Sequence, residues 1–323
     1  MKIKIFFFII GLAVLFISIS TTINAEEQTT KIVCTNSILA DFTSNIIKKN
    51  ASIEYIMPSG VCPAFYDTTP SDVNKITDAD IIISFGSPSM EPWLADLLNY
   101  NENHNLIECK DMGEWNIPSG AKSYVEYLKE QLSEILSEQN ETIKENADSY
   151  LIEIDQMAET LKNSIESKGY ADTKIISMSW QKDFLEWLEL NVTYSYGPPQ
   201  GLSARDQLEV INASNQEEVY VIVDNLQSGT DFGARVASES GASHVIFTNF
   251  PGAIPGTDTY LDMIEYNVEQ LIKGINTYEY KQGEISILQN QVNDLEMQRN
   301  ISLFLVAILV ILSLFLFILY KKK

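Results

Sequence analysis

Short apolar runs rich in β-branched residues alternate with amphipathic stretches along most of the chain. In the first half they predict strands at Lys31–Thr35, Ile53–Met57, Asp80–Ser84 and Asn105–Cys109. In the second half they predict strands at Lys174–Met178, Asn191–Tyr196, Val219–Val223 and Ser243–Phe247. The helices between or after them are Leu39–Lys49, Ser71–Lys75, Lys182–Leu190, Ala204–Ala213, Asp231–Ser240 and Asp258–Gly274. This alternation predicts an α/β fold of two lobes, each with a parallel sheet flanked by helices.

A long helical region separates the two halves. Apolar residues recur at helical spacing from Tyr124 to Leu136, and again from Ile143 to Ile165. The second stripe predicts one helix, with Asn140 as a candidate cap, that spans roughly 35–40 Å at 1.5 Å per residue. We expect this helix to join both lobes. Ser71 and Asp258 are candidate caps of two shorter helices.

Both ends of the chain are strongly apolar. Lys2 and Lys4 precede an apolar run and a small-residue site ending at Ala25, a pattern typical of a secretory signal. The uncharged segment 301–320 is long enough to cross a membrane, and three lysines follow it. The positive-inside rule keeps these lysines cytoplasmic and predicts that the bulk of the chain is extracellular, held by a single C-terminal anchor.

These patterns divide the chain into seven segments. They are a signal peptide (1–25), an N-terminal lobe (26–140), a linking helix (141–168), a C-terminal lobe (169–278), a helical stalk (279–300), a transmembrane helix (301–320) and a basic tail (321–323).

The stalk carries its own apolar pattern. Ile285, Leu288, Val292 and Leu295 recur at spacings of three, four and three, as in two heptads of a coiled coil. The pattern fits a helical spacer that holds the lobes off the membrane. It also fits a weak homodimer formed through the stalk.

Charge and composition narrow the class of partner. The 323 residues contain 44 acidic and 22 basic side chains, and residues 26–300 hold all 44 acids but only 17 of the bases, a charge of −27. Binding of nucleic acid or of an anionic lipid surface needs clustered Lys and Arg, so we expect neither. With two histidines and no Ser-His-Asp or Cys-His arrangement, no enzyme is predicted.

Ligands of open α/β sheets bind beyond the carboxyl ends of the strands, and in a two-lobed protein these ends line the cleft between the lobes. The loops expected there include Asn36 and Trp180. Cys34, Cys62 and Cys109 allow one disulfide and one free thiol, and Cys34 with Cys62 is a candidate pair because both follow first-lobe strands.

Several of these loops resemble one protein family. The segments are Cys34-Thr-Asn-Ser-Ile-Leu-Ala-Asp-Phe, Ile56-Met-Pro-Ser-Gly, Tyr66-Asp-Thr-Thr-Pro-Ser-Asp-Val, Glu91-Pro-Trp-Leu and Gly256-Thr-Asp-Thr-Tyr-Leu. In this order they are similar to the cluster A-I solute-binding proteins of zinc- and manganese-type ABC importers. The resemblance implies two α/β lobes joined by a long helix, capture of a divalent ion in the cleft, and delivery to an ABC permease in the same membrane.

The same resemblance locates the metal ligands, and most are missing. The family's two first-lobe histidines correspond to Ala64 and Ser119, and its second-lobe ligand corresponds to Met178. Only Asp258 matches a ligand outright. His104 and His244 match no ligand position and are expected to be structural. One carboxylate cannot hold Zn²⁺ tightly, because a zinc site needs about four donors.

Three functional interpretations follow. Met178, Cys62 and Asp258 could form a soft site for an ion such as copper, in place of zinc or manganese. Alternatively, the cleft binds a metal chelate or small solute, with Phe65, Tyr66 and Trp180 stacking and Asn36, Ser119 and Asp258 hydrogen bonding. Finally, the scaffold could be a structural or adhesive surface protein. No cofactor is required in any of them.

Overall fold

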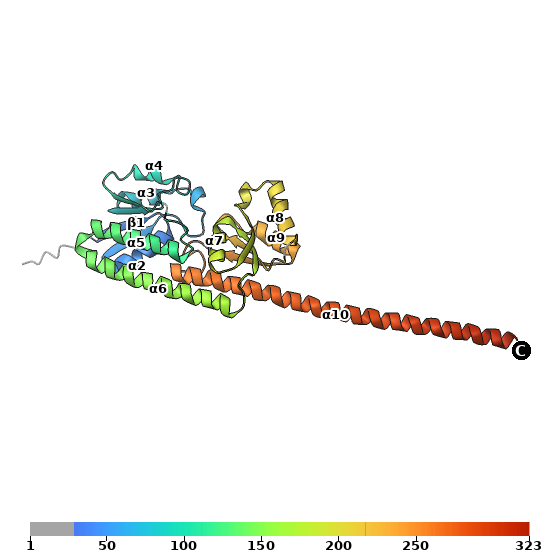
Figure 1. Cartoon of the computed structure of the whole chain (residues 1–323). Helices are drawn as coiled ribbons and strands as arrows, with labels where there is room; N and C mark the ends of the chain where they lie inside the picture. Colours follow the sequence, from blue (N-terminus) through green and yellow to red (C-terminus); the bar gives the residue numbers. More distant parts are fainter. Residues whose placement is uncertain (1–28, 111, 217, 323) are drawn as a thin grey trace, which may run out of the picture.

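The computed structural model describes residues 29–110, 112–216 and 218–322 and shows two lobes side by side (Figure 1). The predicted signal peptide lies outside the described residues, as does Lys323 of the predicted tail. Two long helices run beneath the lobes, and the second of them continues far beyond the globular part (Figure 1).

The first lobe is built on a four-stranded parallel sheet of order β2-β1-β3-β4. Its strands are β1 (Thr30–Cys34), β2 (Ala51–Tyr55), β3 (Ile81–Ser84) and β4 (Asn105–Glu108). Its helices are α2 (Ser37–Ile47), η1 (Lys48–Asn50), η2 (Pro63–Phe65), α3 (Pro70–Thr77), α4 (Leu94–Leu98) and α5 (Pro118–Ile135), followed by η3 (Ser137–Gln139). Every residue of β3 is buried, as expected for a strand covered on both faces.

The second lobe repeats this topology with the order β6-β5-β7-β8, again all parallel. Its strands are β5 (Lys174–Met178), β6 (Asn191–Tyr196), β7 (Val221–Asn225) and β8 (Ser243–Phe247). Its helices are α7 (Ser179–Trp187), η4 (Pro199–Gly201), α8 (Ala204–Gln216), η5 (Leu226–Ser228) and α9 (Asp231–Ser240). The predicted fold class of two α/β lobes is therefore confirmed.

The long helices α6 (Asn140–Ser167) and α10 (Tyr260–Lys321) connect the two lobes. One hydrophobic core includes residues of both sheets, of α6 and of the start of α10, so the lobes share buried apolar surface. α10 lies very close to β8, since a Cβ on Gly274 would come within 2.4 Å of Val245 Cγ2. After Tyr278, the described side chains of α10 are exposed.

Three predicted helix caps are wrong. α6 begins at Asn140 rather than after it. Thr69 and Thr259 are the N-caps of α3 and α10, in place of Ser71 and Asp258. In both cases the carboxylate of the aspartate three residues later accepts hydrogen bonds from the threonine N–H and hydroxyl, forming a capping box that the alternative residues could not form.

The candidate disulfide between Cys34 and Cys62 does not form, because all three cysteines are free. Cys34, the last residue of β1, and Cys109, which directly follows β4, are both buried, and the Cys34 sulfur lies 3.7 Å from the Thr43 hydroxyl. Burial raises the pKa of the Cys34 thiol to about 12, so this thiol is an unreactive core group.

Candidate functional site

The lobes contact each other through loops at the carboxyl ends of their strands, where a cleft ligand was expected. Ser37, which follows β1, donates a hydrogen bond from its hydroxyl to the carbonyl of Pro251, which follows β8, at 2.9 Å. Gln227, which follows β7, donates from Nε2 to the carbonyl of Ser59, which follows β2, at 2.8 Å. Ser59 also donates to the Ser37 hydroxyl at 3.0 Å. The first two bonds join the strand-end regions of the two lobes directly, and the third connects their two first-lobe residues.

A second group of contacts surrounds Trp115, in the loop between β4 and α5. Its indole Nε1 donates to the carbonyl of Asn249 at 2.8 Å, and its ring stacks on Phe85 with centroids 4.6 Å apart. Asn249 accepts a further hydrogen bond at its side-chain oxygen from Gln181 Nε2, at 2.7 Å. Gln181 is fully buried on the second-lobe helix α7. The lobes therefore meet through buried polar and aromatic side chains.

Buried carboxylates lie near these loops. Glu91 is 4% exposed, and neither of its oxygens has a hydrogen-bond partner of normal geometry among the described residues. Burial raises the pKa of Glu91 to about 7, although Thr35 and the N–H groups of Phe85 and Gly86 lie near enough to lower it in part. Glu91 is therefore protonated in much of the folded population near neutral pH.

Asp41 on α2 connects three helices. Its carboxylate accepts hydrogen bonds from the Tyr150 hydroxyl of α6 at 3.0 Å and from the Tyr260 N–H of α10 at 3.1 Å. Burial raises the pKa of Asp41 to about 6, because it outweighs these hydrogen bonds. Asp41 thus links the first lobe, the linking helix and the start of α10.

The predicted cleft residues of the first lobe occupy different environments. Asn36 is buried and caps α2 by accepting a hydrogen bond from the Leu39 N–H at 3.1 Å. Tyr66 donates from its hydroxyl to Asp72 at 2.7 Å. Phe65, on η2, is 71% exposed. Asn36 and Tyr66 therefore have structural partners, whereas the Phe65 ring is accessible.

The candidate metal-ligand positions of the first lobe offer few donors. Ala64 and Cys62 are half-buried in the loop around η2. Ser119 is exposed in the first turn of α5 and lines a groove between α5 and α6, together with Lys122 and Asp155. The Ser119 side chain therefore lies on the groove formed by the helices α5 and α6.

The second-lobe positions differ from one another as well. Met178, the last residue of β5, is fully buried in an apolar cluster with Tyr196 and Phe232. Trp180, in the first turn of α7, is 37% exposed. Asp258 is exposed, one residue before the N-cap of α10. Nowhere in residues 29–110, 112–216 and 218–322 do three or more His, Cys, Asp or Glu side chains form a group that could hold a metal ion.

Both histidines make structural contacts. His104 Nδ1 bonds to the carbonyl of Asn101. His244 Nε2 lies 2.8 Å from Asp224 Oδ2, and the Tyr196 hydroxyl donates to the other oxygen of the same carboxylate at 2.5 Å. Asp224 is fully buried.

The sequence reasoning missed the roles of Asp224 and of the amide side chains between the lobes. Asp224 is an acidic residue directly after the apolar run Val221-Ile-Val223, and that signal could have marked it. No comparable signal marked Gln181, Gln227 or Asn249, because amides are common in surface loops.

Comparisons with known proteins agree with this architecture. The family model described as zinc-uptake complex component A periplasmic matches residues 32–274. The manganese-binding lipoprotein MntA of Halalkalibacterium halodurans is 25% identical over 283 residues, which cover 79% of this chain and 92% of that protein. The iron ABC transporter substrate-binding lipoprotein MtsA of Streptococcus pyogenes serotype M1 is 25% identical over 292 residues, which cover 79% and 91%.

Solved structures show the same fold. A Mn-bound periplasmic metal binding protein from Candidatus Liberibacter asiaticus superposes with a TM-score of 0.67 and 19% identity, covering 77% of this chain and all of that one. A crystal structure of ZnuA gives a TM-score of 0.64 at 16% identity and covers 75% and 97%. Because the family model spans most of the chain, and the relatives are transport proteins rather than enzymes, the chain belongs to the zinc-uptake component A family of solute-binding proteins of metal-type ABC importers.

Proposed function

We propose that this chain captures a metal chelate or a small organic solute between its lobes and delivers it to an ABC permease. The observation that carries the proposal is the chemistry of the family's ligand positions. Ala64 has no donor atom, Ser119 has a neutral hydroxyl on an outer groove, and the Met178 thioether is enclosed in an apolar cluster. Asp258 alone cannot replace the donors that a bare Zn²⁺ or Mn²⁺ ion requires.

The residues proposed to contact the solute are those left accessible near the strand ends. Phe65 and Trp180 are exposed aromatic side chains, one after β2 and one after β5, and are suited to stacking on a planar group. Asp258, which is exposed, would supply a polar contact. The other expected polar residues are engaged elsewhere: Asn36 is the buried cap of α2, Tyr66 donates to Asp72, and Ser119 lines the groove between α5 and α6. A soft-ion site of Cys62, Met178 and Asp258 would require Met178 to leave its cluster, so we assign the solute to the chelate or organic class. The chain itself performs no catalysis in this proposal.

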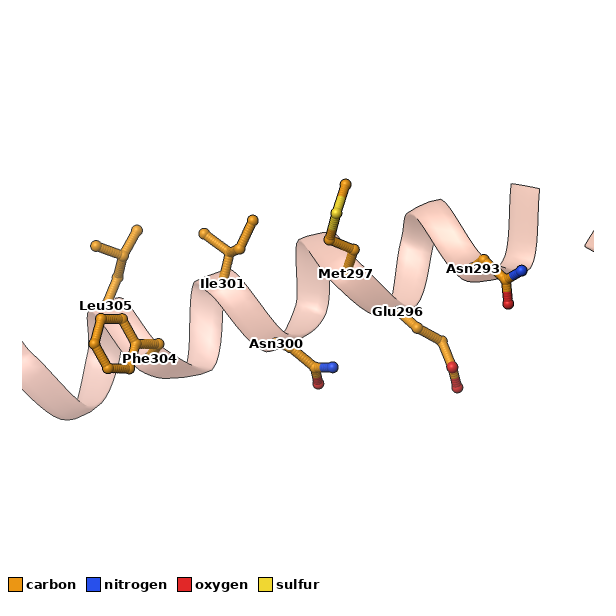
Figure 2. Close-up of a pocket in the computed structure, with 7 residues that line it drawn as sticks. All are labelled: Asn293, Glu296, Met297, Asn300, Ile301, Phe304 and Leu305. Atoms are coloured by element: carbon orange, nitrogen blue, oxygen red, sulfur yellow. The ribbon is translucent and has the colours of Figure 1, made fainter. Parts of the chain in front are cut away.

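The proposal includes anchoring by the end of α10. This helix is long and apolar enough to cross a membrane, and its apolar window has no contact with the lobes. Figure 2 shows the boundary between the stalk and the apolar segment of α10, where the polar side chains of Asn293, Glu296 and Asn300 are followed by Ile301 and Phe304. We therefore propose a single C-terminal transmembrane anchor with the lobes outside the cell. The relatives named above are lipoproteins, so their printed names indicate a different kind of anchor.

The experiment is to purify the full chain in mild detergent and identify bound molecules by native mass spectrometry and elemental analysis. Trp180→Ala is expected to weaken binding of the identified ligand at least tenfold. Tyr100→Ala is the matched control, because it removes an exposed aromatic side chain of the first lobe, and this variant should bind as the wild type does. A ligand present at a hundredfold its Kd should stabilise the protein by about 2.7 kcal/mol.

Two results would contradict the proposal. One is tight stoichiometric binding of free Zn²⁺, Mn²⁺ or Cu⁺ that Asp258→Ala abolishes, which would restore a metal site. The other is the absence of any bound ligand together with no thermal shift from metals or chelates, which would favour the structural or adhesive role.

A further inference from the structure

The stalk, residues 279–300 of α10, carries an apolar seam that no described part of the chain covers. Ile285, Leu288, Val292 and Leu295 are between 46% and 64% exposed, although α10 is continuous from the second lobe through this region. Four large aliphatic side chains on one line of a helix are costly to leave in water. The seam therefore needs a partner.

The residue types along the seam specify that partner. Assigned to a heptad, Ile285 and Val292 occupy a positions, and Leu288 and Leu295 occupy d positions. β-branched residues at a with leucine at d favour two parallel strands over trimers or tetramers. We propose that the stalk forms a parallel two-stranded coiled coil with a second copy of this chain.

The flanking charges are compatible with this arrangement and limit its length. In a parallel dimer each g residue faces the e residue of the next heptad, which pairs Glu284 with Gln289 and Gln291 with Glu296 of the other copy. Neither pair brings two like charges together, although the chain has 44 acidic residues. Lys281 and Arg299 fall at the next d and a positions, so the seam ends at Ile285 and Leu295.

The orientation follows from the proposed membrane anchor, on which this inference rests. Two copies inserted in the same membrane both have the span 301–320 below the stalk, so their stalks are parallel and their heptads are at equal heights. The seam covers about 16 Å at 1.5 Å per residue, which is short for a free coiled coil. Confinement to one membrane raises the effective concentration of the second copy and compensates for this shortness.

Cysteine cross-linking of the full chain in liposomes tests the proposal. In a Cys62→Ser background, which leaves only the buried Cys34 and Cys109, we place one cysteine at the seam (Leu288→Cys) or on the opposite face (Asn290→Cys). Mild oxidation is expected to give a disulfide-linked dimer from Leu288→Cys, with at least tenfold less from Asn290→Cys. Equal yields from the two variants, or no dimer from either, would overturn the proposal.

A second comparison separates the stalk from the membrane span as the source of association. Adding Val292→Glu and Leu295→Glu to the Leu288→Cys protein should reduce the yield of cross-linked dimer at least fivefold. The control adds Asn290→Glu and Met297→Glu to the same protein, which places the same charge on the outer face, and its dimer yield should be unchanged. An undiminished dimer in the protein with Val292→Glu and Leu295→Glu would refute the proposal that the stalk seam holds the two copies together. Carbonate extraction of every variant shows separately whether the anchor is inserted, so a failed anchor is distinguished from a failed dimer.

Discussion

Replacement of Met178 by alanine distinguishes a core residue from a metal ligand. Met178 is fully buried at the end of β5, in the apolar cluster with Tyr196 and Phe232. Truncation removes the buried thioether and leaves a cavity, which for Met→Ala costs about 2–5 kcal/mol of unfolding free energy. For a protein of this size that corresponds to a decrease of roughly 5–15 °C in Tm. Binding of Cu⁺ should not change, because the sulfur faces apolar side chains.

The assay is thermal unfolding followed by tryptophan fluorescence, since Trp180 and Trp187 lie on the helix that directly follows Met178. Met297→Ala is the matched control, because this methionine is 57% exposed on the stalk and its loss should leave Tm within about 1 °C. Isothermal titration with Cu⁺ completes the comparison. A Met178→Ala protein with unchanged Tm and abolished Cu⁺ binding would refute the core assignment and support the soft-metal site.

Two further predictions concern buried carboxylates. A Cβ at Gly233 would lie 2.1 Å from Asp224 Oδ2, so Gly233→Ala must displace a buried carboxylate held by Tyr196 and His244. We expect the unfolding free energy measured in urea to fall by about 1–3 kcal/mol. No measurable loss would contradict the contact. Asp41 has its pKa raised from 3.8 to about 6, so its stabilising contribution is fully present below pH 3.8 and is lost as the pH rises through about 6. Asp41→Asn should reduce the difference in stability between pH 5 and pH 8 by at most about 1.4 kcal/mol, because only about one pKa unit of the shift lies above pH 5. An unchanged pH dependence would show that Asp41 does not titrate in this range.

Most of the fold was predictable because local patterns and packing agree. The run Ile81-Ile-Ile83 is buried in β3, as its unbroken apolar character indicated, and the stripe from Ile143 to Ile165 packs in the linking helix α6. Helix starts were less predictable. Thr69 and Thr259 were preferred to Ser71 and Asp258 because a capping box depends on two residues acting together, and a single polar residue does not specify it.

The site was less predictable because it depends on contacts between residues far apart in sequence. The resemblance placed Met178 at a ligand position, but the direction of its side chain depends on α9 and β6, which enclose it with Phe232 and Tyr196. Likewise, Trp115 and Asn249 are 134 residues apart, and no pattern along the chain indicates that they are hydrogen bonded.

The contacts between the lobes do not involve the positions at which the resemblance places the family's metal ligands. The hydrogen bonds of Ser37, Ser59 and Gln227, together with the Trp115–Asn249 pair, use none of the four ligand positions. The shared hydrophobic core adds stability that is likewise independent of a bound ion. The substitutions that the resemblance implies at Ala64 and Ser119 would therefore remove donors without removing a contact that holds the lobes together. The change of solute proposed above would therefore leave the contacts between the lobes in place, because they involve other residues than the ligand positions.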